Sequence, residues 1–349
     1  MTISRRLRKK HLAILFAVAL PVALYLVAAA RVSWIPRTFV VSDSVTGIAF
    51  SPDGNTLAVG HYRRVELKKT AEEEAWNNCG QLELWDVRSR HPILAFAHNE
   101  SEPVERLTFG RTPKTLIYMN QDGRVRCLNL SNNQSRVVPG VVCKNFPLSF
   151  ALSPDSQQFS IADKRTIRSY NISNGSLVRT FATPLQKPED DGSMDSLQYS
   201  QDGSILCARL SYDSSFHVFD ARTGKSLSTV VSNTGFIEEG SLAPDGKTLA
   251  LSGGKFLRLY DFQSHASRQF PIGPVAVRCI AWSPDSNLLA VGNLDGLLRL
   301  WDVRSGKLLH SWAETMPGGF SVDHLAFSPD SRTLASATSL DRITLRRVQ

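Results

Sequence analysis

Two short segments resemble the end of a phosphate-binding loop, and both lack a required glycine. Gly224-Lys225-Ser226 and Gly246-Lys247-Thr248 match the last part of G-x-x-x-x-G-K-[ST], in which a Gly-rich loop and a Lys bind phosphates. Phe219 and Ser241 stand where the pattern needs its first Gly. Both segments also follow strand-like runs in turn-like surroundings, whereas the loop must lie between a strand and a helix. We therefore predict hairpin turns at both places.

The other reactive residue types form no catalytic or metal-binding pattern. The chain has no H-E-x-x-H or G-x-S-x-G motif, and its eight His residues lack ligand spacing. The acidic segment PEDDGSMD (188–195) lacks the alternating ligand register of a calcium-binding loop and is expected to be a solvated loop. The sequence thus predicts a protein that is not an enzyme and binds no metal or cofactor.

The five cysteines are an odd number and include no C-x-x-C pair. Cys127, Cys207 and Cys279 stand in apolar, strand-like runs, where a free thiol packs as a small apolar group. Cys79 and Cys143 stand in irregular stretches and could pair outside the cytoplasm. The sequence leaves that pairing open, and unpaired thiols are the favoured interpretation.

The elements that must position these residues are set by two phrases that recur in step. The first ends in Trp-Asp or a variant of it: QLELWD (81–86), RVRCLN (124–129), TIRSYN (166–171), SFHVFD (215–220), FLRLYD (256–261), LLRLWD (297–302) and RITLRR (342–347). Its final residues are 43, 42, 49, 41, 41 and 45 positions apart. A repeat of this length is typical of a four-stranded propeller blade.

The second phrase places a polar turn between two apolar strands. It occurs as AFSPDGNTLAVG (49–60), TFGRTPKTLIYM (108–119), ALSPDSQQFSIA (151–162), QYSQDGSILCAR (198–209), SLAPDGKTLALS (241–252), AWSPDSNLLAVG (281–292) and AFSPDSRTLASA (326–337). Pro presets φ, Asp accepts hydrogen bonds from nearby backbone, and Gly or Ser follows, as a tight turn requires. Each unit is therefore strand, turn, strand, loop, strand, and a fourth strand.

With two in-phase motifs, the chain resembles the WD-repeat family of β-propellers from about residue 38 to 349. The resemblance implies an all-β, seven-bladed ring of four-stranded antiparallel sheets. The chain ends after the third strand of the seventh unit, so we expect residues 37–42 to supply the missing strand. Pairing the start of the chain to its end would leave no open sheet edges. The propeller would then comprise residues 37–349.

The family's polar network is only partly present. The resemblance places Asp122, Asp295 and Asp341 at its turn position and His98 at its His position, while Trp85 and Trp301 alone keep the Trp. Tyr170, Phe219 and Tyr260 replace the Trp in three other units. We therefore expect apolar packing to hold most blades together.

The net charge of +8 belongs to the N-terminal tail. Residues 1–37 hold seven of the 40 Lys and Arg residues and no acidic residue, so 33 basic and 32 acidic side chains remain beyond them. The body thus lacks the excess positive charge that binds a phosphate backbone, and nucleic acid is not an expected partner.

The tail itself resembles a membrane-targeting segment. Residues 12–30 are 19 uncharged residues, which as a helix would span about 28 Å of the bilayer. We expect residues 1–11 to be a basic cytoplasmic tail, 12–30 a transmembrane signal anchor, and 31–36 a short linker. Ala28-Ala29-Ala30 also offers a cleavage site, so a signal peptide is the alternative. Either interpretation places the propeller outside the cytoplasm, membrane-tethered in the first and secreted after cleavage near Ala30 in the second.

Two insertions break the repeat on the face that carries the partner-binding loops in this family. They are HYRRVELKKTAEEEAWNNCG (61–80) and ATPLQKPEDDGSMDS (182–196). The pairs Lys68/Glu72 and Lys69/Glu73 have helical i,i+4 spacing and predict a short surface helix. Trp76 beside Arg63 and Arg64 has the composition of an interface hot spot, although Trp76 could instead pin the insertion to its blade.

Tyr212 and Asp213, in the corresponding loop of the fourth unit, are further candidates for protein binding. The sequence predicts a membrane-tethered scaffold whose loops bind an unidentified protein partner. Two alternatives remain open: a ligand-binding or catalytic propeller acting on a small molecule at the channel mouth, or a purely structural envelope protein.

Overall fold

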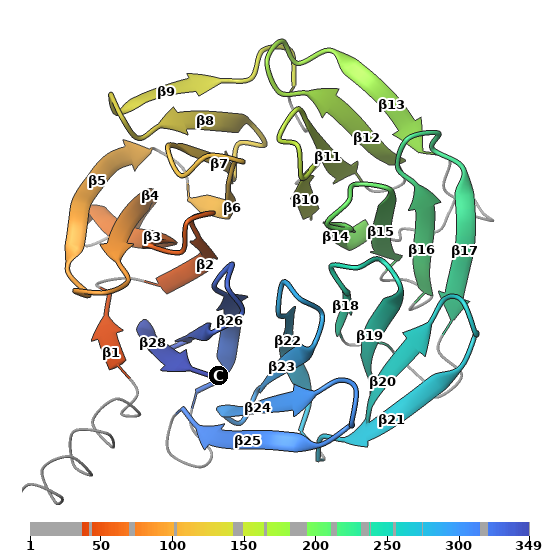
Figure 1. The fold of residues 1–349 in the computed structure, drawn as a ribbon. Coiled ribbons are helices and arrows are strands. Elements are labelled where there is room, and N and C mark those ends of the chain that lie inside the picture. The colour runs from red at the N-terminus through yellow and green to blue at the C-terminus, as the bar shows by residue number, and fades with distance from the viewer. Residues whose placement is uncertain are drawn as a thin grey trace, which may run out of the picture.

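Each repeat unit forms one four-stranded antiparallel sheet, and the seven sheets are arranged in a ring (Figure 1). The computed structural model describes residues 37–41, 44–69, 74–100, 103–141, 149–163, 166–181, 194–210, 215–231, 237, 239–253, 256–273, 275–314 and 320–348. Within these ranges all regular secondary structure is β, and the prediction of an all-β, seven-bladed propeller is confirmed.

The blades are numbered in chain order, and each lists its strands from the centre outwards. Blades one to four contain β2 (Ser44–Phe50), β3 (Thr56–Lys69), β4 (Glu74–Asp86) and β5 (Pro92–Glu100); β6 (Val104–Phe109), β7 (Thr115–Asn120), β8 (Val125–Asn129) and β9 (Gln134–Val137); β10 (Ser149–Leu152), β11 (Gln158–Asp163), β12 (Thr166–Asn171) and β13 (Leu177–Phe181); β14 (Met194–Tyr199), β15 (Ile205–Leu210), β16 (Ser215–Asp220) and β17 (Ser226–Val231). Blades five to seven contain β18 (Glu239–Leu242), β19 (Thr248–Gly253), β20 (Phe256–Asp261) and β21 (Ser267–Pro271); β22 (Val277–Trp282), β23 (Leu288–Asn293), β24 (Leu297–Asp302) and β25 (Leu308–Ala313); β26 (Val322–Phe327), β27 (Thr333–Thr338), β28 (Arg342–Arg347) and β1 (Arg37–Val40).

The fourth strand of blade seven comes from the start of the described chain. β1 pairs antiparallel with β28, with Arg37 opposite Leu345 and Val40 opposite Arg342. Phe39 of this strand stacks on Trp85 of blade one, with ring centroids 4.2 Å apart. One short strand therefore completes the last blade and contacts the first.

The predicted membrane helix at residues 12–30 lies outside the described residues. Within the part of the chain that the structure describes, no helix is long and apolar enough to span a bilayer.

The turn between the first and second strands is held by its own Ser and Asp. In blade four, Ser200 Oγ donates to Asp202 Oδ1 at 2.6 Å and accepts from the Ile205 N–H at 2.9 Å. Equivalent bonds recur in blades one, three, six and seven. The recurring S-P-D phrase is therefore a turn motif, as predicted.

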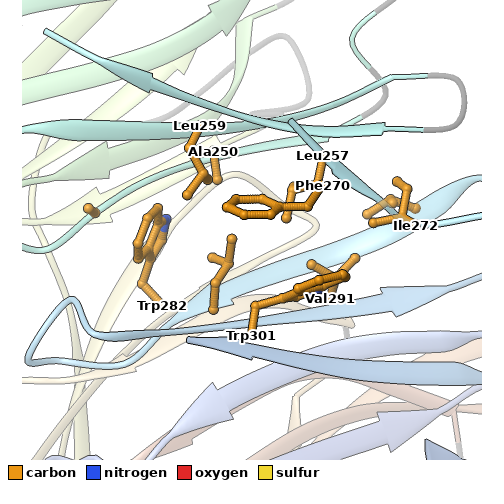
Figure 2. Packing of buried hydrophobic residues seen from close by; sticks show 11 residues of the cluster. Ala250, Leu257, Leu259, Phe270, Ile272, Trp282, Val291 and Trp301 are labelled. Atoms are coloured by element: carbon orange, nitrogen blue, oxygen red, sulfur yellow. The ribbon is translucent and has the colours of Figure 1, made fainter. Parts of the chain in front are cut away.

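Apolar packing joins neighbouring blades at a repeated position. An aromatic residue on the fourth strand of one blade packs on the third-strand aromatic of the next: Phe270 on Trp301, with centroids 5.4 Å apart, and Phe181 on Phe219 at 5.5 Å. Figure 2 shows Phe270 and Trp301 facing each other between blades five and six. Such pairs contribute about 0.5–1.5 kcal/mol beyond the area they bury.

The polar network of the family is incomplete in this ring. The Trp301 indole N–H has no hydrogen-bond partner among the described residues, whereas the Trp85 indole donates to Glu83 at 2.9 Å. Asp122 lies in a turn between second and third strands, as expected, but its partner is Arg126 at 2.8 Å. The side chain of His98 lies outside the described residues. Trp301 is therefore held by its packing on Phe270 rather than by a hydrogen bond to a described residue.

Candidate functional site

The second and third strands of blade one form a ribbon that extends well beyond the rest of its sheet. β3 has 14 residues and β4 has 13, whereas the second and third strands of blade six have six each. Ser44, at the start of β2, pairs with Tyr62, so the ribbon from residue 63 onwards passes the end of the first strand. We call the side of the ring to which this ribbon points the hairpin face.

The predicted surface helix in this insertion is wrong. Lys68 and Lys69 belong to β3, where they pair with Ala75 and Glu74 of β4. An i,i+4 ion pair contributes only about 0.2–0.5 kcal/mol, and a helix of one or two turns is marginal in water. Continued pairing with the neighbouring strand satisfies more backbone groups, so the strands run on instead.

The register of the ribbon separates the predicted binding residues into two sets. Arg64 pairs with Asn78 and Glu66 pairs with Trp76, so Arg64 and Trp76 occupy positions on one face of the ribbon. Arg63 pairs with Cys79 and belongs to the opposite face. The other predicted residues, Tyr212 and Asp213, and most of the insertion at 182–196 lie outside the described residues.

The first strands of six blades surround a cavity of about 560 Å³ at the centre of the ring. Its lining is mainly polar and comes from the middle part of these strands: Thr46, Gly47, Ile48, Arg106, Leu107, Ser196, Gln198, Glu239, Gly240, Arg278, Cys279, Ile280, Asp323, His324 and Leu325. The cavity therefore lies in the central channel, and its wall includes the first strand of the blade that carries the ribbon.

A β-bulge occurs at one level of four first strands and brings two charged residues, Arg278 and Asp323, to this cavity. The extra residues are Thr46, Glu105, Arg278 and Asp323 in blades one, two, six and seven. Two residues oppose one at each bulge, which re-aims the local side chains. Arg278 Nε lies 3.3 Å from Asp323 Oδ1, so an ion pair links two neighbouring blades at the channel.

The two most reactive groups in this cavity are held in unreactive forms. His324 Nε2 donates to the Val45 carbonyl at 3.2 Å, and burial together with the Arg106 charge lowers the pKa of His324 to about 4. Cys279 Sγ donates to the Val322 carbonyl at 3.1 Å, and burial, followed by the nearby Glu239 and Asp323 charges, raises the pKa of its thiol. At neutral pH the His is therefore uncharged with its Nε2 proton engaged, and the thiol is not a nucleophile.

The remaining site predictions have mixed outcomes. Cys127, Cys207 and Cys279 are free thiols in strands, as predicted. Cys143 and the side chain of Cys79 lie outside the described residues, so their pairing stays a prediction. Within the described ranges, no three His, Cys, Asp or Glu side chains are grouped closely enough to hold a metal ion. Both phosphate-loop lookalikes are hairpin turns with Gly224 and Gly246 at positive φ, as predicted.

Sequence comparisons agree with the architecture. The WD40 family profile, "WD domain, G-beta repeat", matches residues 36–65 and 268–302. The chain is 27% identical over 241 residues to the serine-threonine kinase receptor-associated protein of Gallus gallus, covering 67% of this chain and 64% of that protein. It is 31% identical over 317 residues to apoptotic protease-activating factor 1 of Homo sapiens, covering 80% of this chain and 21% of that protein.

A third relative is the target of rapamycin complex subunit wat1 of Schizosaccharomyces pombe, 27% identical over 153 residues, or 42% of this chain and 47% of that protein. The chain therefore spans less than two thirds of the length of these relatives. The two WD40 matches and the seven four-stranded blades together support the WD-repeat propeller family.

Proposed function

We propose that this chain is an interaction scaffold whose hairpin face binds a partner protein. The observation that carries the proposal is the β3–β4 ribbon, which extends past the first strand of its own sheet. In the part of the chain that the structure describes, the first strand ends its pairing at Tyr62, so the ribbon beyond that residue is not needed to complete the blade. A loop or ribbon on a rigid scaffold is a common place for recognition.

The relatives support an interaction role without identifying a partner. The name of one describes a receptor-associated protein, and the name of another describes a subunit of a complex. Those associations belong to the relatives. For this chain they favour binding over catalysis, in agreement with the unreactive forms of His324 and Cys279 at the channel.

The N-terminal segment extends the proposal to location. We propose that residues 12–30 anchor the chain in a membrane with the propeller on the extracytoplasmic side, because 19 uncharged residues follow a basic stretch. N-terminal sequencing of the mature protein tests this directly. An anchored chain keeps residues 1–30, whereas a mature chain starting at Arg31 would contradict the anchor and indicate a secreted propeller.

Proximity labelling from the intact protein tests the interaction. We expect Trp76→Ala and Arg64→Ala to lose the same specific neighbour, because both residues occupy one face of the ribbon. Arg63→Ala, on the opposite face, is the matched control for charge and position. Tyr212→Ala and Asp213→Ala probe the corresponding loop predicted for blade four. A neighbour set that no variant changes would contradict the scaffold and favour a structural envelope role.

The alternative of a small-molecule ligand rests on the channel cavity. Arg106 and Glu239 line it from different blades and could hold a ligand that carries both charges. If this is the function, Arg106→Gln and Glu239→Gln should each remove saturable binding of a zwitterionic probe such as free glycine. Unchanged neighbour sets together with such binding would favour this alternative over the scaffold.

A further inference from the structure

A second cavity lies between blades two and three, on the side of the ring opposite the hairpin face. It has a volume of about 900 Å³, within the range of pockets that bury small organic ligands. Its wall combines the turn between β6 and β7, the turn between β8 and β9, and the turn between β10 and β11. None of these segments belongs to the hairpin face, so the cavity is independent of the proposed partner site.

Two wall positions carry smaller residues than their counterparts in other blades. Gly110 stands where Ser51, Ser153, Ser200, Ser283 and Ser328 begin their turns, because all of these residues make the same backbone bond to the residue five positions later. Cys127, opposite Ile117, stands where four other blades have Leu84, Leu259, Leu300 and Leu345. The residues opposite those Leu side chains are Ala58, Ala250, Ala290 and Ala335, whereas Ile117 is opposite Cys127. Only the Gly110 position has therefore lost side-chain volume outright, and it leaves room at the cavity.

The fold does not require the glycine. A Cβ built on Gly110 would be 3.5 Å from Thr115 and 3.7 Å from Ile117, which are ordinary van der Waals distances. Gly110 is also not among the residues at positive φ. The backbone would accept Ser here, so the missing side chain opens the cavity without serving the turn.

The wall is partly apolar and carries two guanidinium groups. Ile117, Cys127 and Ile172 give it apolar surface, and Arg111 and Arg136 line it as well. Arg136 Nη2 donates to the Ile172 carbonyl at 3.1 Å. Burial raises the pKa of the Cys127 thiol, and the nearby Arg136 charge partly offsets that increase. The positive charge therefore lies close to the apolar wall.

The carboxylate on this wall is already engaged. Asp155 Oδ1 accepts from Ser153 Oγ at 2.6 Å and from the Gln157 N–H at 3.0 Å within its own turn. The side chain of Arg111 is exposed, and its backbone N–H donates to Ser156 Oγ at 2.8 Å, which fixes the residue at the cavity rim. A planar guanidinium pairs best with a carboxylate, which it can bind through two hydrogen bonds.

We propose that the cavity between blades two and three binds a small organic carboxylate with an apolar body. The apolar part lies against Ile117, Cys127 and Ile172, and the carboxylate pairs with Arg111, with Arg136 adding positive charge. Arg136 also holds the two blades together, as Arg179 and Arg268 do through the same kind of bond to blades four and six. Arg111 is therefore the cleaner residue to change.

The test is calorimetric titration of the full chain with naphthalene-2-carboxylate and with its uncharged analogue naphthalen-2-ylmethanol. We expect saturable binding of the carboxylate, weakened about tenfold in the analogue and in Arg111→Gln, since a charge-assisted hydrogen bond is lost in each. Gly110→Ser combined with Cys127→Leu adds side-chain volume to the cavity wall and should abolish binding at a temperature at which the variant is still folded. Arg222→Gln, an exposed cation of blade four outside the cavity, is the matched control and should bind normally.

Three results would overturn the proposal. They are no saturable binding of the carboxylate, binding that survives in the folded Gly110→Ser/Cys127→Leu double variant, and equal binding of the carboxylate and the alcohol. If only a peptide ending in a free carboxylate binds, and the double variant abolishes it, the occupant is a protein segment and the small-molecule proposal is wrong.

Discussion

Breaking a buried ion pair between blades six and seven by removing one partner should cost the ring several kcal/mol. In blades one and six, the third-strand Trp lies opposite a second-strand Leu: Trp85 opposite Leu57 and Trp301 opposite Leu289. Arg346 lies opposite Leu334 in the same way, so Arg346 occupies the third-strand aromatic position of blade seven. Arg346 is 8% exposed and Glu314 is 6% exposed.

Glu314 satisfies this arginine from the end of blade six. Arg346 Nη1 donates to Glu314 Oε1 and Arg346 Nη2 donates to Oε2 at 2.9 Å, while Ser336 Oγ donates to Oε1 at 2.8 Å. The guanidinium carbon also lies 5.3 Å from the ring centroid of Trp312. The charged pair is therefore desolvated but almost fully compensated.

Glu314→Ala leaves the Arg346 charge buried and unpaired. Removing one partner of a buried pair costs about 3–5 kcal/mol, which for a domain of this size lowers the thermal midpoint by roughly 5–15 °C. Thermal unfolding followed by circular dichroism measures this shift. The double variant Glu314→Leu/Arg346→Met removes both charges and should return to within about 1–2 kcal/mol of the parent, because apolar residues can replace a buried pair.

Arg278→Ala provides the comparison with an exposed pair. The Arg278 side chain is 58% exposed and that of Asp323 is 20% exposed, so losing their 3.3 Å contact should cost no more than about 1 kcal/mol. If Glu314→Ala lowers the midpoint no more than Arg278→Ala does, burial does not set the strength of these pairs and the reasoning is refuted.

Three other perturbations test the packing and the turns. Phe270→Ala should lower the free energy of unfolding in urea by about 3–5 kcal/mol, because Phe270 fills the interface with Trp301. The Phe256 side chain is exposed, so Phe256→Ala should lower it far less. Equal losses in the two variants would contradict the role given to packing between blades. Gly175→Ala places a Cβ 1.8 Å from the Pro139 carbonyl oxygen, whereas Gly140→Ala places one with no neighbour within 4 Å, although φ is similar at Gly175 (+70°) and Gly140 (+72°). Gly175→Ala should therefore destabilise the fold far more. Similar thermal midpoints for the two variants would show that steric contact is unimportant at Gly175. Hydrogen bonds, chiefly from the turn Ser, hold the pKa of the Asp53, Asp202 and Asp330 carboxyls below their ordinary value of 3.8. The stability that these carboxylates add is therefore present above pH 3.8 and is lost as the pH falls through their lower folded pKa. Urea midpoints that do not fall between about pH 5 and pH 2.5 would contradict this prediction.

The ring could be predicted because its determinants are local and repeated. A Ser and an Asp two residues apart set the turn between the first and second strands in five blades, as Ser200 and Asp202 do. The third-strand aromatic marks the packing between blades, as Trp301 does against Phe270. Where either signal occurs it stands at the same place in its period, so several weak matches in step add up to one architecture.

The site could be predicted only in part because it combines residues far apart in the chain. The charged cavity of the central channel unites Arg106, Glu239 and Asp323 from three blades, and β-bulges that no local motif marks contribute to it. The insertion after His61 carries i,i+4 charge pairs that favour a helix, yet pairing along the neighbouring strand decides its form. In this insertion, pairing with the neighbouring strand outweighs the i,i+4 spacing of the charged residues.

The same limit applies to the cavity between blades two and three. Gly110 and Cys127 are unremarkable in the sequence and become informative only when the register aligns them with Ser and Leu in other blades. A comparison of repeats position by position is the signal that could have found them.

The role proposed for the β3–β4 ribbon of the hairpin face is to hold a partner protein. Its most direct test is to shorten the ribbon by replacing residues 64–78 with Asn-Gly, which closes the Arg63–Cys79 pair with a two-residue turn. The account predicts that the intact and shortened chains unfold at similar temperatures and that proximity labelling of the shortened chain loses at least one specific neighbour. An identical set of neighbours at an unchanged thermal midpoint would contradict it.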